Sequence, residues 1–171
     1  MSEHIKAELK PITYGCDELA STADSIKKHG FALTGFSGRS MYPMLRYETD
    51  KVLVEKATGP FTKYDVVLYP NNHGKYVLHR IIKIKNGEYI IRGDNNLFNE
   101  YGITDNEIIG ILKGFYHGKK YIDCKKNKGY KLYTFIWTHT FFIQWFYKKC
   151  IFPTYRLGIR ILSKIKHTIF K

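Results

Sequence analysis

Short runs rich in valine, isoleucine and tyrosine, separated by turn residues, most limit what this chain can fold into. Glycine, proline, asparagine and threonine lie between the runs, and this alternation is typical of β-strands joined by tight connections. The predicted strands are Lys51 to Lys56, Asp65 to Tyr69, Tyr76 to Ile84, Tyr89 to Arg92, Ile108 to Tyr116 and Lys120 to Cys124. The sequence therefore predicts a mainly β fold built from a small, mostly antiparallel domain.

One connection between these runs is specific enough to predict its geometry. Asn86-Gly87 stands between the apolar residues Ile84 and Tyr89. Asparagine and glycine tolerate the positive φ angles that a two-residue hairpin turn requires. We therefore expect the runs on either side of this pair to form a β-hairpin.

A short helix is predicted ahead of the β domain. Apolar residues recur there at helical spacing, at Leu19, Ala23 and Ile26. Acidic residues at its start and basic residues at its end suit the helix dipole, and Gly30 is a typical stop. We expect a helix from Asp17 to His29, followed by a strand from Phe31 to Phe36.

The net charge of +13 belongs entirely to the last third of the chain. Residues 1–112 contain 14 Lys/Arg and 14 Asp/Glu, whereas residues 113–171 contain 14 Lys/Arg and a single acid, Asp123. Leu132 to Tyr147 is an uncharged, aromatic run of 16 residues, shorter than the ~20 residues that span a bilayer. From Tyr155 onward, apolar residues recur every four positions among basic ones, at Leu157, Ile161, Ile165 and Ile169.

This pattern predicts a basic, helical C-terminal tail that lies on an anionic membrane surface. A helical hairpin packed on the β domain is the structural alternative. Binding to nucleic acid is disfavoured because no recognised nucleic-acid module accompanies the basic and aromatic residues. The expected organisation is an N-terminal helix and lead-in strand in 1–35, a β domain in 36–124 and the tail in 125–171.

Three further properties limit the class of protein. Three widely spaced cysteines, Cys16, Cys124 and Cys150, form neither a disulfide framework nor a metal site, which favours a reducing compartment. The first ten residues contain no apolar run, so we expect neither a secretory signal nor an N-terminal anchor, and a peripheral position on the cytoplasmic side of the membrane. No metal-ligand spacing and no glycine-rich nucleotide loop is present, so no cofactor is expected.

Three polar clusters stand in order among the predicted strands. They are Ser37-Gly38-Arg39-Ser40-Met41-Tyr42-Pro43-Met44, then Leu78-His79-Arg80, with His79 39 residues after Ser40, and then Arg92-Gly93-Asp94-Asn95-Asn96. In this order they resemble the boxes of the signal peptidase I and LexA-like serine peptidases. The endoplasmic-reticulum and archaeal signal peptidases are the nearer resemblance, because they have histidine where bacterial enzymes have lysine. The resemblance covers about residues 36–114 and implies the small coiled β domain of that superfamily.

The first two clusters contain the residue types of a serine hydrolase. A serine hydroxyl is a weak nucleophile at neutral pH and needs a base within hydrogen-bonding reach. Ser40 and His79 suit these two roles. A strand would hold His79 rigidly, with Val77 and Ile81 on the same face.

Two carboxylates, Asp94 and Glu100, are available to orient the imidazole of His79. The resemblance implies that the orienting acid is Glu100, six residues after Asp94, and that Asp94 has a structural role. Because the family residue is aspartate rather than glutamate, Asp94 stays the second candidate. Each of these residues, taken alone, has an ordinary structural explanation, and only their combination indicates catalysis.

The residues around Ser40 are candidates for substrate contact. The backbone N–H of Ser40 is the first expected donor to an oxyanion. Many family members add a hydroxyl two residues before the nucleophile, where this chain has Gly38, so Ser37 is the alternative donor. Glycine at that position allows a positive φ or a close substrate approach. The predicted substrate-binding residues are Ser37, Gly38, Met41, Tyr42 and Pro43.

We therefore expect a serine endopeptidase that cleaves a leader or signal-like peptide at the membrane surface, with a preference for small residues before the scissile bond. A non-catalytic peptide-binding or membrane-adaptor protein with the same fold is the alternative. A self-cleaving, LexA-like regulator is disfavoured, because the roughly 35 residues before the Ser40 loop are too few for a helix-turn-helix domain.

Overall fold

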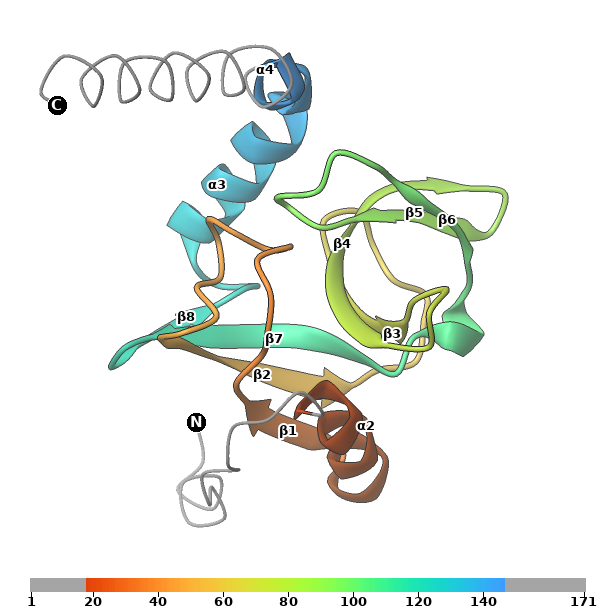
Figure 1. Ribbon diagram of the computed structural model, residues 1–171, viewed down its shortest axis with the longest axis vertical. Coiled ribbons are helices and arrows are strands. Elements are labelled where there is room, and N and C mark those ends of the chain that lie inside the picture. Colours follow the sequence, from red (N-terminus) through yellow and green to blue (C-terminus); the bar gives the residue numbers. More distant parts are fainter. Residues whose placement is uncertain (1–17, 147–171) are drawn as a thin grey trace, which may run out of the picture. The chain divides into compact units, whose positions relative to one another are not determined.

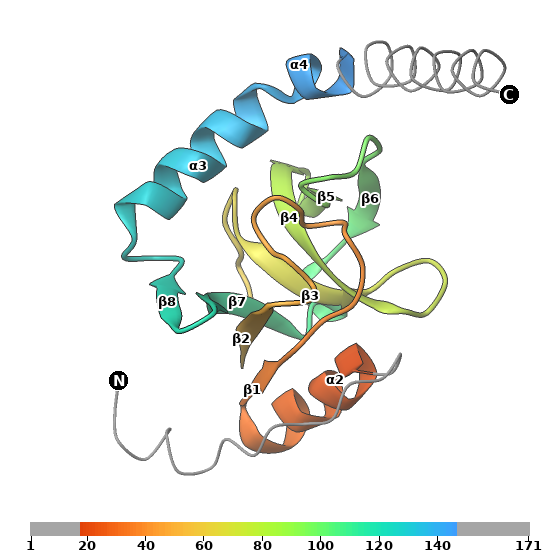
Figure 2. The same ribbon diagram turned by 60° about the vertical axis from the view of Figure 1, so that its left-hand side comes forward.

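The computed structural model describes residues 18–146 (Figures 1 and 2). It contains α2 (Glu18–His29), β1 (Phe31–Thr34), β2 (Asp50–Lys56), β3 (Val66–Pro70), β4 (Tyr76–Lys85), β5 (Glu88–Arg92), β6 (Glu100–Ile103), the 3-10 helix η1 (Asp105–Glu107), β7 (Gly110–His117), β8 (Lys120–Asp123), α3 (Lys128–His139) and α4 (Phe141–Phe146). The predicted mainly β fold is confirmed.

The eight described strands form one sheet in the order β1-β2-β7-β3-β4-β5-β6, with β8 paired to β7. All of these pairs are antiparallel. Figure 1 shows that β3 to β6 curl round one another, whereas β2 and β7 extend as a long ribbon above β1 and α2. Shifts of register between β4 and β5 and between β5 and β6 favour this curl, because a bulge bends the strand that contains it.

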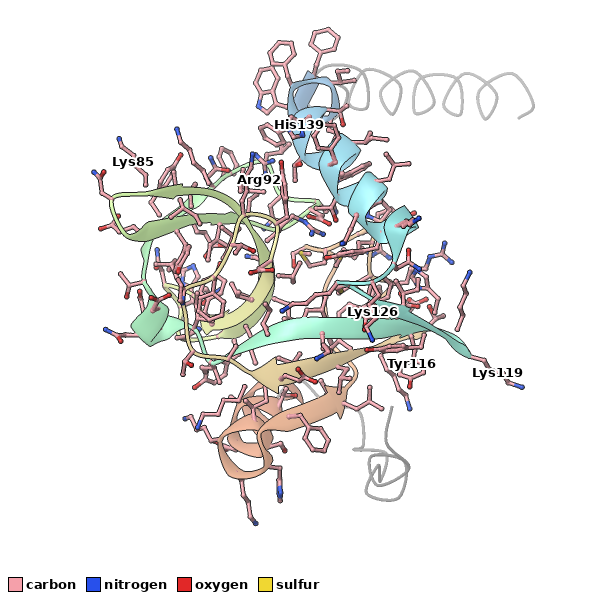
Figure 3. The ribbon with its side chains drawn as sticks, turned by 180° about the vertical axis from the view of Figure 1, so that it is seen from behind. Lys85, Arg92, Tyr116, Lys119, Lys126 and His139 are labelled. Atoms are coloured by element: carbon pink, nitrogen blue, oxygen red, sulfur yellow. The ribbon has the colours of Figure 1, made fainter. Side chains whose placement is uncertain are left out.

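The local signals in the sequence predict their elements well. The helix α2 ends at His29, and the N–H of Gly30, which has a φ of +81°, bonds the Ile26 carbonyl at 2.9 Å. Asn86 and Gly87 both have positive φ, at 53° and 79°, and connect β4 to β5 as the predicted hairpin. Figure 3 labels Lys85 beside this turn and Lys119 in the β7–β8 turn, where both side chains point outward.

One strand, β6, is absent from the strands predicted from the sequence.

The two faces of β4 lie against different clusters of buried side chains. Leu78 belongs to a cluster that includes Ile26, Met41 and Met44 beneath the loop between β1 and β2. Ile81 belongs to a second cluster with Tyr69 of β3. Because side chains alternate along a strand, neighbouring residues of β4 serve opposite sides of the sheet.

The chain divides into two compact units, one that ends at Thr134 and one that starts at Phe135. The predicted boundary between β domain and tail lies at residue 124, and the first half of α3 lies in the first of these two units. Two side chains of this half of α3 are hydrogen-bonded to the β domain: Arg80 of β4 donates to Tyr130 and Thr134.

In the second unit, Gln144 of α4 bonds the end of α3. Its side chain donates to the Trp137 carbonyl at 2.8 Å, and its backbone N–H donates to Thr140. No helix in the described part of the chain is long and apolar enough to cross a bilayer. The amphipathic helix predicted from Tyr155 onward lies outside the described residues.

Candidate active site

The imidazole of His79 lies inside the domain, in the middle of β4. Only 4% of the residue is exposed. Val77 and Ile81, two positions away on either side, pack on the same buried cluster as Tyr69, as the alternation of the strand predicts. The strand and this packing hold the ring in a single place, as a catalytic base requires.

Glu100 orients this ring. The Nδ1 atom of His79 lies 2.8 Å from Oε1 of Glu100. A hydrogen bond from His79 lowers the pKa of the Glu100 carboxyl below its ordinary value, and this effect outweighs the partial burial that would raise it. Because an ionised carboxylate can only accept hydrogen bonds, Nδ1 carries the proton and donates it.

With Nδ1 engaged by Glu100, Nε2 is the nitrogen of His79 that is left to exchange a proton with another group. It is buried, and among residues 18–146 it has no hydrogen-bond partner. Leaving a buried acceptor unpaired costs about 1–3 kcal/mol. A nitrogen in this state is suited to accept a proton from a group that approaches it.

Tyr69 completes the cluster, and sequence reasoning did not identify it. Its hydroxyl lies 3.1 Å from Nδ1 of His79, and it also hydrogen-bonds the Glu100 carboxylate. Burial and then the charge of Glu100 raise the pKa of Tyr69 well above its ordinary value, so the phenol remains a donor. A tyrosine within a valine- and leucine-rich strand gives no sequence signal of a polar role.

The strand β6 places Glu100 at this site. Ile81 of β4 pairs with Ile91 of β5, and Ile91 pairs with Glu100, so the three residues form a row across the sheet. Arg92, labelled in Figure 3, donates to the Asn99 side chain at 3.3 Å and so closes the loop that precedes β6.

Asp94 lies on the opposite face of β4 and binds Arg80. Two hydrogen bonds of 2.8 Å join Nε and Nη2 of Arg80 to the two carboxylate oxygens of Asp94. Burial alone would lower the pKa of Arg80, but the Asp94 carboxylate raises it above its ordinary value. The structure thus brings Glu100, and not Asp94, to His79, because His79 and Arg80 are neighbours on a strand and point to opposite faces.

The loop that contains Ser40 is fixed against the turn after β5 (Figure 2). The N–H of Asn95 donates to the Ser40 carbonyl at 2.7 Å, and the Asn95 side chain donates to the Arg39 carbonyl at 3.0 Å. A Cβ atom on residue 93 would lie 2.7 Å from the backbone carbonyl oxygen of Ser40, so only glycine permits this approach of the two segments. Ser40 itself is partly exposed.

The predicted substrate-binding residues separate into two groups. Ser37, Gly38 and Tyr42 are exposed and Pro43 is partly exposed. Gly38 has a φ of +90°, a conformation that L residues other than glycine rarely adopt. Met41 is only 3% exposed, and its sulfur accepts the Asp94 N–H at 3.5 Å. Met41 therefore supports the loop from the buried side.

Within residues 18–146, no group of three or more His, Cys, Asp or Glu side chains could hold a metal ion. A scan of protein-family models finds none that matches this chain, and a search of curated proteins finds no significant match.

Replacing Glu100 by glutamine should remove the negative charge beside the His79 ring and weaken control of its tautomer. An amide carries no charge to stabilise a protonated imidazole, and its NH₂ group can favour the wrong tautomer of His79. If the site acts as the serine hydrolase expected from the sequence, peptide turnover should fall by about 10²- to 10⁴-fold with little change in KM. The matched control is Glu88→Gln, which changes an exposed carboxylate on β5.

The same variant should change the pH dependence of stability. Because the pKa of Glu100 is lower in the folded chain than the ordinary 4.5, its stabilising effect is full above that pH and is lost as the pH falls through the folded value. Urea unfolding should therefore give a stability difference between wild type and Glu100→Gln that shrinks in acid. A constant difference would contradict the hydrogen bond assigned between His79 and the ionised Glu100 carboxylate.

Proposed function

We propose that this chain is a serine endopeptidase in which Ser40 is the nucleophile and His79 is the general base. The observation that carries the proposal is the state of the His79 ring, whose Nδ1 donates to Glu100 while Nε2 is buried and unpaired among the described residues. The loop that contains Ser40 is held by two contacts. Arg80 of β4 bonds the Met44 sulfur, and Asn95 in the turn after β5 bonds the Ser40 carbonyl.

The reaction follows from these roles. The Ser40 hydroxyl attacks the scissile carbonyl and gives its proton to Nε2 of His79. The imidazolium that forms is stabilised by the Glu100 carboxylate at Nδ1, and the backbone N–H of Ser40 donates to the oxyanion. Nε2 then returns the proton to the leaving amine. Water, activated by the same nitrogen, hydrolyses the acyl-enzyme and restores the serine.

The proposed type of fold is the coiled β domain of signal peptidases and LexA-like peptidases. Its support is the curled antiparallel sheet together with the order of the Ser40, His79 and Asp94 clusters along the chain. The proposed substrate is a leader or signal-like peptide with a small residue before the scissile bond.

We place the reaction at an anionic membrane surface. Large apolar side chains are exposed on the last two helices of residues 18–146: Leu132, Phe135 and Ile136 on α3, and Phe142, Ile143 and Phe146 on α4. The excess of 14 basic residues over one acid in residues 113–171 complements anionic lipid headgroups. Apolar insertion with basic attraction is the usual basis of interfacial binding.

A peptide library tests this proposal. Wild type and Ser40→Ala are incubated with the library in the presence of anionic or neutral vesicles, and new termini are identified by mass spectrometry. We expect cuts after small residues that only the wild type makes, and faster cutting with anionic vesicles. If folded wild type makes no cut that Ser40→Ala lacks, the peptidase proposal fails and a non-catalytic peptide binder takes its place.

A further inference from the structure

The first half of α3 presents hydroxyl groups as well as aromatic rings to the β domain. Thr134 is 3% exposed, and Tyr130 and Tyr133 are partly buried beside it. Positions 130, 133 and 134 share one side of a helix, whereas the exposed Leu132 lies on another. The contact between α3 and the domain therefore depends on directed hydrogen bonds as well as on packing.

These hydroxyls all bond the buried ion pair between Arg80 and Asp94. The Nη1 atom of Arg80 donates to Tyr130 at 3.0 Å and to Thr134 at 3.3 Å. The Tyr133 hydroxyl donates to Oδ2 of Asp94 at 3.1 Å. Arg80 is 0% exposed, so no water replaces a partner that is removed.

The same ion pair also contacts the loop that contains Ser40. The Nη2 atom of Arg80 lies 2.8 Å from the Met44 sulfur, and the Asp94 N–H donates to the Met41 sulfur. The next residue, Asn95, donates its N–H to the Ser40 carbonyl at 2.7 Å. A continuous path of contacts thus runs from α3 through Arg80 and Asp94 to Ser40.

We propose that Tyr133 and Thr134 are positioning residues for the Ser40 loop, acting through Asp94 and Arg80. The catalytic part of this inference rests on the proposed peptidase function. Each hydroxyl fixes one member of the ion pair, and the ion pair fixes the loop on both sides of Ser40. Misplacing a nucleophile by about 1 Å can lower a rate by about 10²-fold, so small changes in this path affect turnover more than substrate binding.

The test uses Tyr133→Phe and Thr134→Val, which remove the hydroxyls and keep the shape of the side chains. Tyr116→Phe on β7, labelled in Figure 3, is the matched control, because the Tyr116 ring packs on Tyr121 and no hydrogen bond of its hydroxyl is found among the described residues. Two readouts are measured: the split between kcat and KM in peptide cleavage, and hydrogen exchange of individual backbone amides.

We expect each variant to speed exchange of the Asn95 amide by about fivefold, the equivalent of one lost hydrogen bond. The Leu45 amide, which bonds Met41 within the loop, should follow it. Amides of the β1–β2 pair, such as Leu53, should not change. In cleavage, kcat should fall by at least the same factor while KM stays constant, and Tyr116→Phe should match wild type in both readouts.

Unchanged exchange at Asn95 would overturn the inference, and so would equal acceleration of the Asn95 and Leu53 amides, because it would reveal general loss of stability. The failure of the peptidase proposal is a separate result. If wild type cleaves nothing, the catalytic part fails with it, and hydrogen exchange still decides whether α3 holds the Ser40 loop.

Discussion

Replacing His79 by alanine is expected to lower peptide cleavage by about 10³-fold or more, with normal folding. The variant removes the imidazole that acts as the general base in the proposed mechanism. Ser40→Ala should cause a loss of the same size. Because the two residues act in one step of the proposed mechanism, the double variant should be no worse than either single variant. Initial rates of cleavage of a peptide found in the library provide the measurement.

Two controls match these substitutions. His73→Ala removes an exposed histidine in the turn between β3 and β4, and Ser25→Ala removes a serine hydroxyl from α2. Both should retain the wild-type rate. Losses at Ser40 and His79 that multiply in the double variant would mean that the two side chains act independently, which the proposed mechanism does not allow.

Replacing Asp94 by alanine is expected to destabilise the domain by about 3–5 kcal/mol, because it leaves the buried guanidinium of Arg80 without its carboxylate. Both side chains of this pair are almost fully buried, at 0% and 1% exposed. Urea unfolding followed by circular dichroism measures the change in the free energy of unfolding. The surface pair Lys113–Glu55 is the control, since its side chains are 38% and 40% exposed and Glu55→Ala should cost no more than about 1 kcal/mol.

A double variant keeps this prediction testable if Asp94→Ala does not fold. Arg80→Met with Asp94→Leu removes both charges and fills most of the space, so it should be more stable than Asp94→Ala. A cost of Asp94→Ala no larger than that of Glu55→Ala would contradict the structural role assigned to the ion pair.

Local patterns in the sequence predict the elements that depend on local physics. Alternation of apolar residues and turn chemistry predict the β strands and the Asn86-Gly87 hairpin, and the spacing of Ala23 and Ile26 predicts α2. The strand β6 escapes this reasoning, because Glu-Tyr-Gly-Ile is short and contains one apolar aliphatic residue. It forms through pairing with β5, a tertiary effect that local propensity does not contain.

The candidate site shows the same division. Ser40, His79 and Glu100 could be proposed from the sequence, through chemistry and a family resemblance. The choice between Asp94 and Glu100 depends on which face of β4 each side chain joins, and alternation already places His79 and Arg80 on opposite faces. Tyr69 and the hydroxyls of α3 could not be predicted, since their roles arise from contacts between segments far apart in the chain.

The reactivity of a thiol at position 40 tests most directly whether the Ser40 side chain is paired with His79. In a Ser40→Cys variant, the rate of alkylation by iodoacetamide is followed against pH, and peptide mapping separates this thiol from Cys16, Cys124 and Cys150. If Nε2 of His79 takes the proton from position 40, the pKa of the introduced thiol lies well below its ordinary value and returns to it when His79 is also replaced by alanine. The same pH profile with and without His79 would contradict the account.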